Sequence, residues 1–189
     1  MLDVDNTPEE DGRFGEMIVN NIFHLYFKNQ ESYLFKDFYV EDDRGVHQID
    51  HIFILKNGIF VVETKNISGR IYGSINSDIW TIVYDKNHQY PLLNPLIQND
   101  SHIAALKYIF GDMYDFQSMI VFPHYKKPAW CVSDKIFSKK EFISHLSNFK
   151  PEKELTHEDM AYIVGVLNDI QSNKKELKEK FKQQIKARS

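Results

Sequence analysis

Residues 47–66 hold the most structural information in the chain, and they read His-Gln-Ile-Asp-His-Ile-Phe-Ile-Leu-Lys-Asn-Gly-Ile-Phe-Val-Val-Glu-Thr-Lys-Asn. An Asn-Gly pair between two runs rich in β-branched and aromatic residues is a strong hairpin signal. We therefore expect strands at about 47–55 and 59–65, joined by residues 56–58. The run from Gly58 to Val62 is apolar on both faces, which predicts a central strand covered on both sides.

Three charged residues, Asp50, Glu63 and Lys65, fall inside this hairpin. Because side chains alternate along a strand, Glu63 and Lys65 share one face while Thr64 points to the other. Buried charges need partners, and two carboxylates on adjacent strands can share one Mg²⁺ ion. Lys65 would then orient a water or stabilise negative charge during phosphodiester cleavage. The simpler alternative is a salt bridge between Lys65 and a carboxylate at the strand end.

The composition describes one domain, with or without a helical appendage. Of the 189 residues, 42% are hydrophobic and 14% aromatic, which is enough for a packed core. The single cysteine, Cys131, excludes an internal disulfide and suits a reducing compartment. No stretch reaches the roughly 18–20 apolar residues of a membrane span, and the acidic N-terminus lacks the order of a signal peptide. We therefore expect a cytoplasmic protein.

A helix is expected from about residue 12 to 29. Its apolar stripe consists of Phe14, Ile18, Ile22 and Leu25, and it is widened by Val19, Phe23 and Tyr26. Glu16 falls at the edge of this stripe. It is either a third acidic group at the metal site or an exposed residue favoured by the helix dipole. Gly15 beside it permits close approach to another backbone.

Further strands are expected at about residues 33–40, 70–72, 79–84, 118–122 and 129–132. Asn94 and Pro95 begin a helix that runs to about residue 110. Gln98 and His102 lie on its core-facing side, where they either reach the active site or are satisfied core polar groups. Gln48 shares a face with Asp50, so it either binds a ligand or satisfies a strand edge.

The C-terminal third is expected to be helical, with capping signals at Ser138 and Thr156. Residues 171–189 hold seven Lys or Arg and two Glu, whereas the other 170 residues hold 16 basic and 25 acidic residues. This basic tail either contacts phosphates or is a solvated helix face. Its thin apolar seam, formed by Leu177, Phe181 and Ile185, packs either on the domain or on a second chain, as in a homodimer.

Several motifs follow one another in a characteristic order: Gly15-Glu16, Gln48-Ile-Asp-His51, Gly58-Ile-Phe-Val-Val-Glu-Thr-Lys-Asn66, Ser68-Gly69 with Gly73, Trp80, and Asn94-Pro95-Leu-Ile-Gln98 followed by His102. In this order they resemble the nuclease-related domain (NERD) family, over about residues 12–125. The resemblance implies a mixed α/β (α+β) fold of the restriction-endonuclease-like, or PD-(D/E)XK, superfamily, in which helices flank a mixed central sheet. We expect that domain over residues 12–136 and a C-terminal helical extension over residues 137–189.

The resemblance also implies a metal site and its roles. It implies that Asp50 and Glu63, helped by the backbone carbonyl of Thr64, bind Mg²⁺, for which Mn²⁺ can substitute. It implies that Lys65 orients the water or stabilises charge. Glu16 matches the first-helix acidic residue that often completes such sites.

Gln98 matches a polar position of the later helix and joins the expected catalytic residues. The residues expected to contact substrate are Gln48, Asn66 and His102. Together these residues predict a Mg²⁺-dependent nuclease, a hydrolase of phosphodiester bonds with DNA as its substrate. The first alternative is a non-catalytic module that binds nucleic acid or protein through the same surface. The second is an interaction protein that works through its C-terminal helices.

Overall fold

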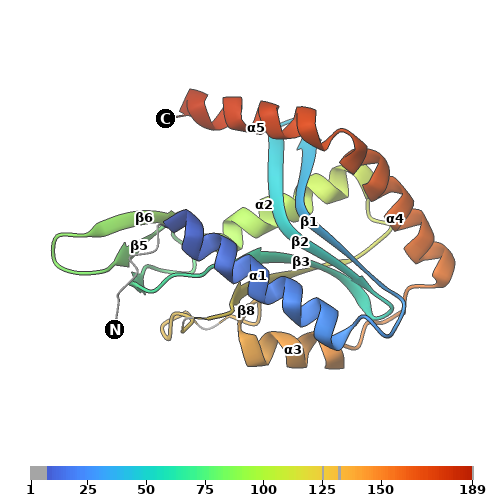
Figure 1. Ribbon diagram of the computed structural model, residues 1–189, viewed down its shortest axis with the longest axis horizontal. Coiled ribbons are helices and arrows are strands. Elements are labelled where there is room, and N and C mark those ends of the chain that lie inside the picture. The colour runs from blue at the N-terminus through green and yellow to red at the C-terminus, as the bar shows by residue number, and fades with distance from the viewer. Residues whose placement is uncertain (1–7, 125, 132, 189) are drawn as a thin grey trace.

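A five-stranded mixed sheet forms the centre of the protein (Figure 1). The computed structural model describes residues 8–124, 126–131 and 133–188. The sheet contains β1 Ser32–Asp42, β2 Gly45–Leu55, β3 Gly58–Thr64, β7 Phe116–Phe122 and β8 Ile136–Ser138, in the order β1-β2-β3-β7-β8. The first three strands are antiparallel, whereas β3, β7 and β8 run parallel. A mixed sheet flanked by helices confirms the predicted fold class.

The predicted hairpin is confirmed as β2 and β3. Leu55 pairs with Gly58, so the connecting loop is Lys56-Asn57. Asn57 ties this loop to the end of a later helix, because its Nδ2 donates to the carbonyl of Leu146 at 2.8 Å. The middle of β3 is fully buried, as expected of a central strand covered on both faces.

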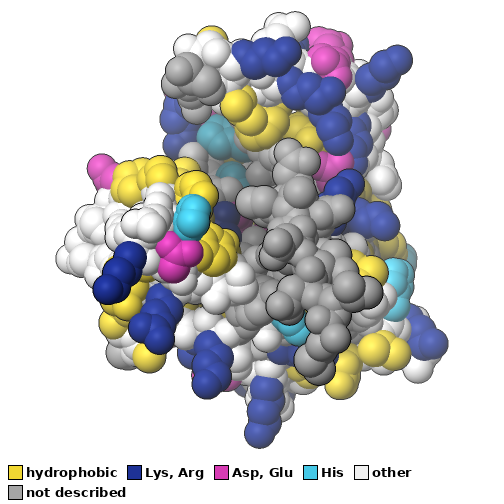
Figure 2. All heavy atoms as spheres, turned by 60° about the vertical axis from the view of Figure 1, so that its left-hand side comes forward, with side chains coloured by type: hydrophobic (Ala, Val, Ile, Leu, Met, Phe, Trp, Pro, Cys, Tyr) yellow, Lys and Arg dark blue, Asp and Glu magenta, His cyan; other side chains and the backbone are white. Residues whose placement is uncertain are grey.

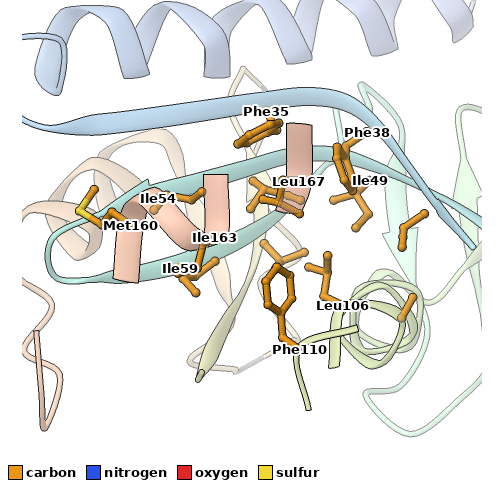
Figure 3. Close-up of a cluster of buried hydrophobic side chains, with 14 residues drawn as sticks. Phe35, Phe38, Ile49, Ile54, Ile59, Leu106, Phe110, Met160, Ile163 and Leu167 are labelled. Carbon is orange, nitrogen blue, oxygen red and sulfur yellow. The ribbon is translucent and has the colours of Figure 1, made fainter. Parts of the chain in front are cut away.

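Helices cover both faces of the sheet. On one face α1 Pro8–Tyr26 and α3 Lys139–Asn148 pack on side chains such as Phe60 and Val62. On the other face α2 Pro95–Phe110 and α4 His157–Ser172 pack on Ile59 and Val61 (Figure 3). The capping residues predicted for α2, α3 and α4 are confirmed. Within the described ranges, no helix is both long and apolar enough to cross a membrane.

A second sheet of three strands projects from the domain (Figure 1). It contains β4 Arg70–Tyr72, β5 Ile79–Val83 and β6 Gln89–Leu93. Trp80 anchors it, since its ring is fully buried and stacks edge-on against Trp130 with centroids 5.0 Å apart. The sequence analysis did not predict β6, an edge strand that contains a proline.

The prediction of a strand at residues 129–132 is wrong. Residues 129 and 130 form a turn, in which the N–H of Cys131 donates to the carbonyl of Pro128 at 3.2 Å. Residue 132 lies outside the described residues. The last strand of the main sheet is β8, which pairs in parallel with β7.

Helix α1 buries only part of the predicted apolar face. Leu25 is 72% exposed and Phe14 is 40% exposed, whereas Val19, Ile22 and Phe23 are buried. This buried face continues through Gly15, where a Cβ would lie 2.6 Å from the Cβ of Asn66. The close approach expected at Gly15 is therefore present, and it sets α1 directly against the chain that follows β3.

Helix α5, Lys174–Arg188, packs across the ends of β1 and β2 (Figure 1). Leu177 is buried against Tyr39 and Val46, and the ring of Phe181 contacts Tyr39 with centroids 5.7 Å apart. The side-chain amide of Gln184 accepts from the N–H of Val46 at 2.9 Å and donates to its carbonyl at 3.1 Å. Two residues of the predicted seam, Leu177 and Phe181, therefore pack on the domain, whereas Ile185 is 49% exposed.

Asp42 holds the turn between β1 and β2. Its carboxylate accepts from the main-chain N–H of Arg44 at 2.9 Å, from Arg44 Nε at 2.9 Å, and also from Arg44 Nη2. His47 Nε2 lies 3.0 Å from Asp42 Oδ1, the oxygen that also accepts the main-chain N–H of Arg44. Burial opposes the charge, but the bonds from Arg44 and His47 outweigh burial and lower the pKa of Asp42 to about 2.

We predict that Gly15→Ala lowers the free energy of unfolding by about 1–3 kcal/mol, the usual cost of overpacking. The matched control is Gly12→Ala in the same helix, where nothing lies within 4 Å of an added Cβ. That variant should be neutral or more stable by up to about 1 kcal/mol, because alanine favours helix. Urea unfolding measures both, and equal stabilities of the two variants would contradict the close packing of α1.

We predict that Asp42→Asn lowers the free energy of unfolding by about 2 kcal/mol at pH 7, from 1.36 kcal/mol per unit of pKa. The folded-state pKa lies below the ordinary value of 3.8, so the stabilisation exists above that value and is lost as the pH falls toward 2. Urea unfolding of both proteins at neutral and strongly acidic pH measures the deficit. A deficit of the same size at both pH values would show that the charge is not its source.

Candidate active site

The candidate site lies at a fork between β2 and β3. Antiparallel pairing of these strands ends at His51 and Val62, whereas β3 continues beside β7 through Thr64. Asp50 and Glu63 come next in register, so they emerge where the strands separate. The main-chain N–H of Thr64 donates to Asp50 Oδ2 at 2.8 Å, which bridges the fork and fixes this carboxylate.

Lys65 is held between two side chains at this fork. Its Nζ donates to Glu63 Oε1 at 2.5 Å and to Gln98 Oε1 of α2 at 3.1 Å. The side chains of Lys65 and Glu63 are 15% and 2% exposed. The salt bridge that the sequence offered as the simpler alternative is present, and it lies inside the cluster of predicted site residues.

His102 of α2 faces the other oxygen of Glu63. Its Nδ1 lies 3.7 Å from Glu63 Oε2, and neither atom has a hydrogen-bond partner within the described residues. Burial lowers the pKa of His102 to about 4, although Glu63 opposes the shift. The ring is therefore neutral at pH 7, so it leaves the charge of this oxygen uncompensated.

The charges near the fork shift one another's pKa values. Burial and the charge of Glu63 raise the pKa of Asp50 well above its ordinary value, against the effects of Lys65 and of the Thr64 N–H. Burial, followed by Asp37 and Glu63, also raises the pKa of Glu16. Burial disfavours the charge on Lys65, but Glu63 and Asp50 outweigh it and raise its pKa. Glu16 of α1 is thus close enough to interact electrostatically with the carboxylates at the fork.

Asp37 contacts the predicted site residue Gln48 and was not itself among the predicted residues. It lies in β1 between the paired residues Lys36 and Phe38, and its φ of 47° is the positive value of a left-handed residue. Its carboxylate accepts from Gln48 Nε2 at 3.0 Å and lies 3.1 Å and 3.3 Å from the Nζ atoms of Lys174 and Lys178. The available signal was an aspartate inside an aromatic strand.

The left-handed residue changes which side chains face each side of the sheet. Residues three apart on a regular strand face opposite sides. Phe35 and Phe38, however, both join the core cluster under α2 and α4, as do Ile49 and Ile52 on β2. The regular alternation of side chains is interrupted at Asp37 and Asp50. This interruption allows Asp50 to occupy the fork.

A cleft of about 440 Å³ opens beside the fork. Asp50, Gln48, Gln98 and His102 line it, so four of the predicted residues share one cavity. Asn66 is different, because its buried side chain packs against Gly15 beneath α1.

Two carboxylates at the fork suit a hard divalent cation. Within the described ranges, no three Asp, Glu, His or Cys side chains are placed to bind one metal ion together. Mg²⁺, however, is often bound by one or two carboxylates, with water and substrate supplying other ligands. Glu63 Oε2 is buried and has no hydrogen-bond partner among the residues that the structure describes, and the charge of Asp50 is disfavoured. A cation at Asp50 and Glu63 would relieve both conditions, so the residues present fit the group.

Comparisons with known proteins identify the family of this chain. An uncharacterized protein of Bacillus anthracis is 29% identical over 166 residues, which cover 84% of this chain and 76% of the relative. No solved structure matches the chain significantly. The family model of the nuclease-related domain matches residues 11–123, which include the fork and α2. The chain therefore belongs to the nuclease-related domain (NERD) family.

Proposed function

We propose that this protein is a metal-dependent nuclease that hydrolyses phosphodiester bonds of DNA. The observation that carries the proposal is the fork, where Asp50, Glu63 and Lys65 meet at the edge of an open cleft. Membership of a nuclease-related family supports it. The same three residue types form a workable set for metal-assisted phosphodiester hydrolysis.

Asp50, Glu63 and the carbonyl of Thr64 would hold the Mg²⁺ ion. When bound, such an ion polarises a phosphate and lowers the pKa of a bound water. The uncompensated oxygen of Glu63 and the fixed carboxylate of Asp50 are the ligands that the fold prepares.

Lys65 then has a defined task. Its contacts to Glu63 and Gln98 use two of the three N–H donors of Nζ, and we assign the third to the attacking water or a phosphoryl oxygen. Gln98 keeps the ammonium in place from α2, so it acts as a positioning residue. His102, neutral at pH 7, supplies a polar group beside the cleft for substrate.

We predict that the wild-type protein nicks or linearises plasmid DNA when Mg²⁺ or Mn²⁺ is supplied, and that Asp50→Ala and Lys65→Met each reduce the rate by at least about 100-fold. Asp112→Ala is the control, since that side chain is 99% exposed and lies outside the cleft. It should cleave at the wild-type rate. Gel electrophoresis over time measures the rates, with RNA and single-stranded DNA as parallel substrates.

Cleavage that survives Asp50→Ala would contradict the assigned site. A wild-type protein that binds DNA without cleaving it under any divalent cation would instead support the non-catalytic binding module.

We predict that Mn²⁺ stabilises the wild-type protein, by about 2.7 kcal/mol at 100 times its Kd. Asp50→Asn should lose this stabilisation, yet be no less stable than wild type in EDTA. The reason is that asparagine removes a buried charge that burial and Glu63 disfavour, while its amide oxygen can still accept from Thr64. Thermal unfolding with and without Mn²⁺ measures this. An equal rise for Asp50→Asn and wild type would place the ion elsewhere.

A further inference from the structure

The cleft beside the fork extends to a second polar group. Beyond Asp50 and Gln98 it is lined by Arg44 from the β1–β2 turn, by His47 from the start of β2 and by Ser101 from α2. Its opposite wall is α5, which contributes Phe181, Gln184 and Ile185. One continuous cavity therefore joins the carboxylate at the fork to an arginine, with a helix beyond the family match as its wall.

Hydrogen bonds hold the Arg44 side chain in one orientation. The Asp42 side chain is 1% exposed and binds Arg44 through Nε and Nη2, while the Arg44 side chain is 48% exposed. Nη2 also lies 3.4 Å from the carbonyl of Ser101. Within the described part of the chain, the side-chain hydrogen bonds of Arg44 use only Nε and Nη2. The two Nη1 donors therefore remain for a ligand in the cleft.

His47 and Ser101 complete the group beside this guanidinium. His47 Nε2 lies 3.0 Å from the same Asp42 carboxylate, and its Nδ1 lies 3.4 Å from the hydroxyl of Ser101. A single buried carboxylate thus fixes an arginine and a histidine on one wall. An arginine held by a buried acid, with hydroxyl and imidazole groups next to it, suits a phosphate oxygen.

We propose that Arg44, His47 and Ser101 form a second phosphate-binding subsite, which holds a phosphate of the same DNA strand away from the bond that is cleaved. The inference rests on the proposed nuclease function. A strand rises about 3.3 Å per residue, so His47 lies roughly 10 Å along β2 from Asp50. At that distance, a phosphate bound by the subsite belongs to a nucleotide close to the one at the fork. The subsite would therefore fix the register of the strand at the fork.

The wall made by α5 suits the same ligand. Phe181 and Ile185 offer apolar surface to sugars and bases, while Gln184 anchors the helix to Val46. Lysine and arginine side chains gather over the upper part of the molecule, where α5 lies (Figure 2). Positive charge beside the cleft attracts a polyanion and speeds its approach.

The test measures binding of a fluorescein-labelled DNA duplex in EDTA, by anisotropy over a range of NaCl concentrations. Arg44→Ala should weaken binding about 10-fold and reduce the slope of log K against log salt by about 0.9, the value for one lost phosphate contact. Arg44→Lys should keep the slope and still bind more weakly, because lysine lacks the planar fork.

Two controls accompany this measurement. Lys56→Ala removes one exposed cation from the β2–β3 loop, where Lys56 pairs with Glu154, and should leave affinity and slope unchanged. Because Arg44→Ala removes the guanidinium partner of the buried Asp42 carboxylate, thermal unfolding must show that the variant is folded at the assay temperature. Arg44→Lys keeps a cation beside Asp42, so its DNA binding provides a second, independent test of the subsite.

The outcomes separate the two proposals. A wild-type protein that cleaves DNA, with Arg44 variants equal to it in affinity, salt slope and KM, overturns the subsite alone. A protein that never cleaves, but whose binding depends on Arg44 in the stated way, supports the subsite and overturns the nuclease. A wild-type protein that does not bind DNA overturns both.

Discussion

Two carboxylates and one ammonium share the fork between β2 and β3, largely out of contact with water, and the architecture around them follows from that burial. Removing an ion from water costs several kcal/mol unless partners compensate. Lys65 compensates one oxygen of Glu63, and Gln98 fixes Lys65. Helix α2 must therefore stay in register with the sheet. Asn99 secures it, because its buried Nδ2 donates to the carbonyl of Val61 and to the hydroxyl of Ser118, each at 2.9 Å.

The C-terminal helix α5, which lies outside the family match, also compensates charge near the fork. Asp37 faces the site from β1, and two lysines of α5 lie against its carboxylate. Burial opposes the charge on Asp37, but those lysines and Tyr39 outweigh it and lower its pKa. Helix α5 therefore balances the negative charge near the fork, and it also forms one wall of the cleft.

Local sequence patterns predicted helices and strands. Features that depend on long-range contacts were not predicted. The hairpin, the central strand β3 and the capped helices carry their signals within a few residues. The edge strand β6 does not, because it is short, exposed and interrupted by Pro91. Asp37 and Arg44 were missed for another reason. The backbone angle of Asp37 is invisible in a sequence pattern, and the role of Arg44 depends on a cleft closed by a helix about 140 residues later.

Position 37 illustrates how narrow the choice of amino acid becomes when backbone and charge make separate demands. A left-handed residue in the middle of a strand favours glycine, which has no Cβ to approach the carbonyl oxygen, or asparagine and aspartate, whose short polar side chains can hydrogen-bond locally. Glycine would allow the bend and lose the lysines, asparagine would keep the shape without the charge, and glutamate would keep the charge on a backbone that resists the angle. Aspartate alone meets both requirements, so relatives that carry a lysine-bearing C-terminal helix should show little variation here.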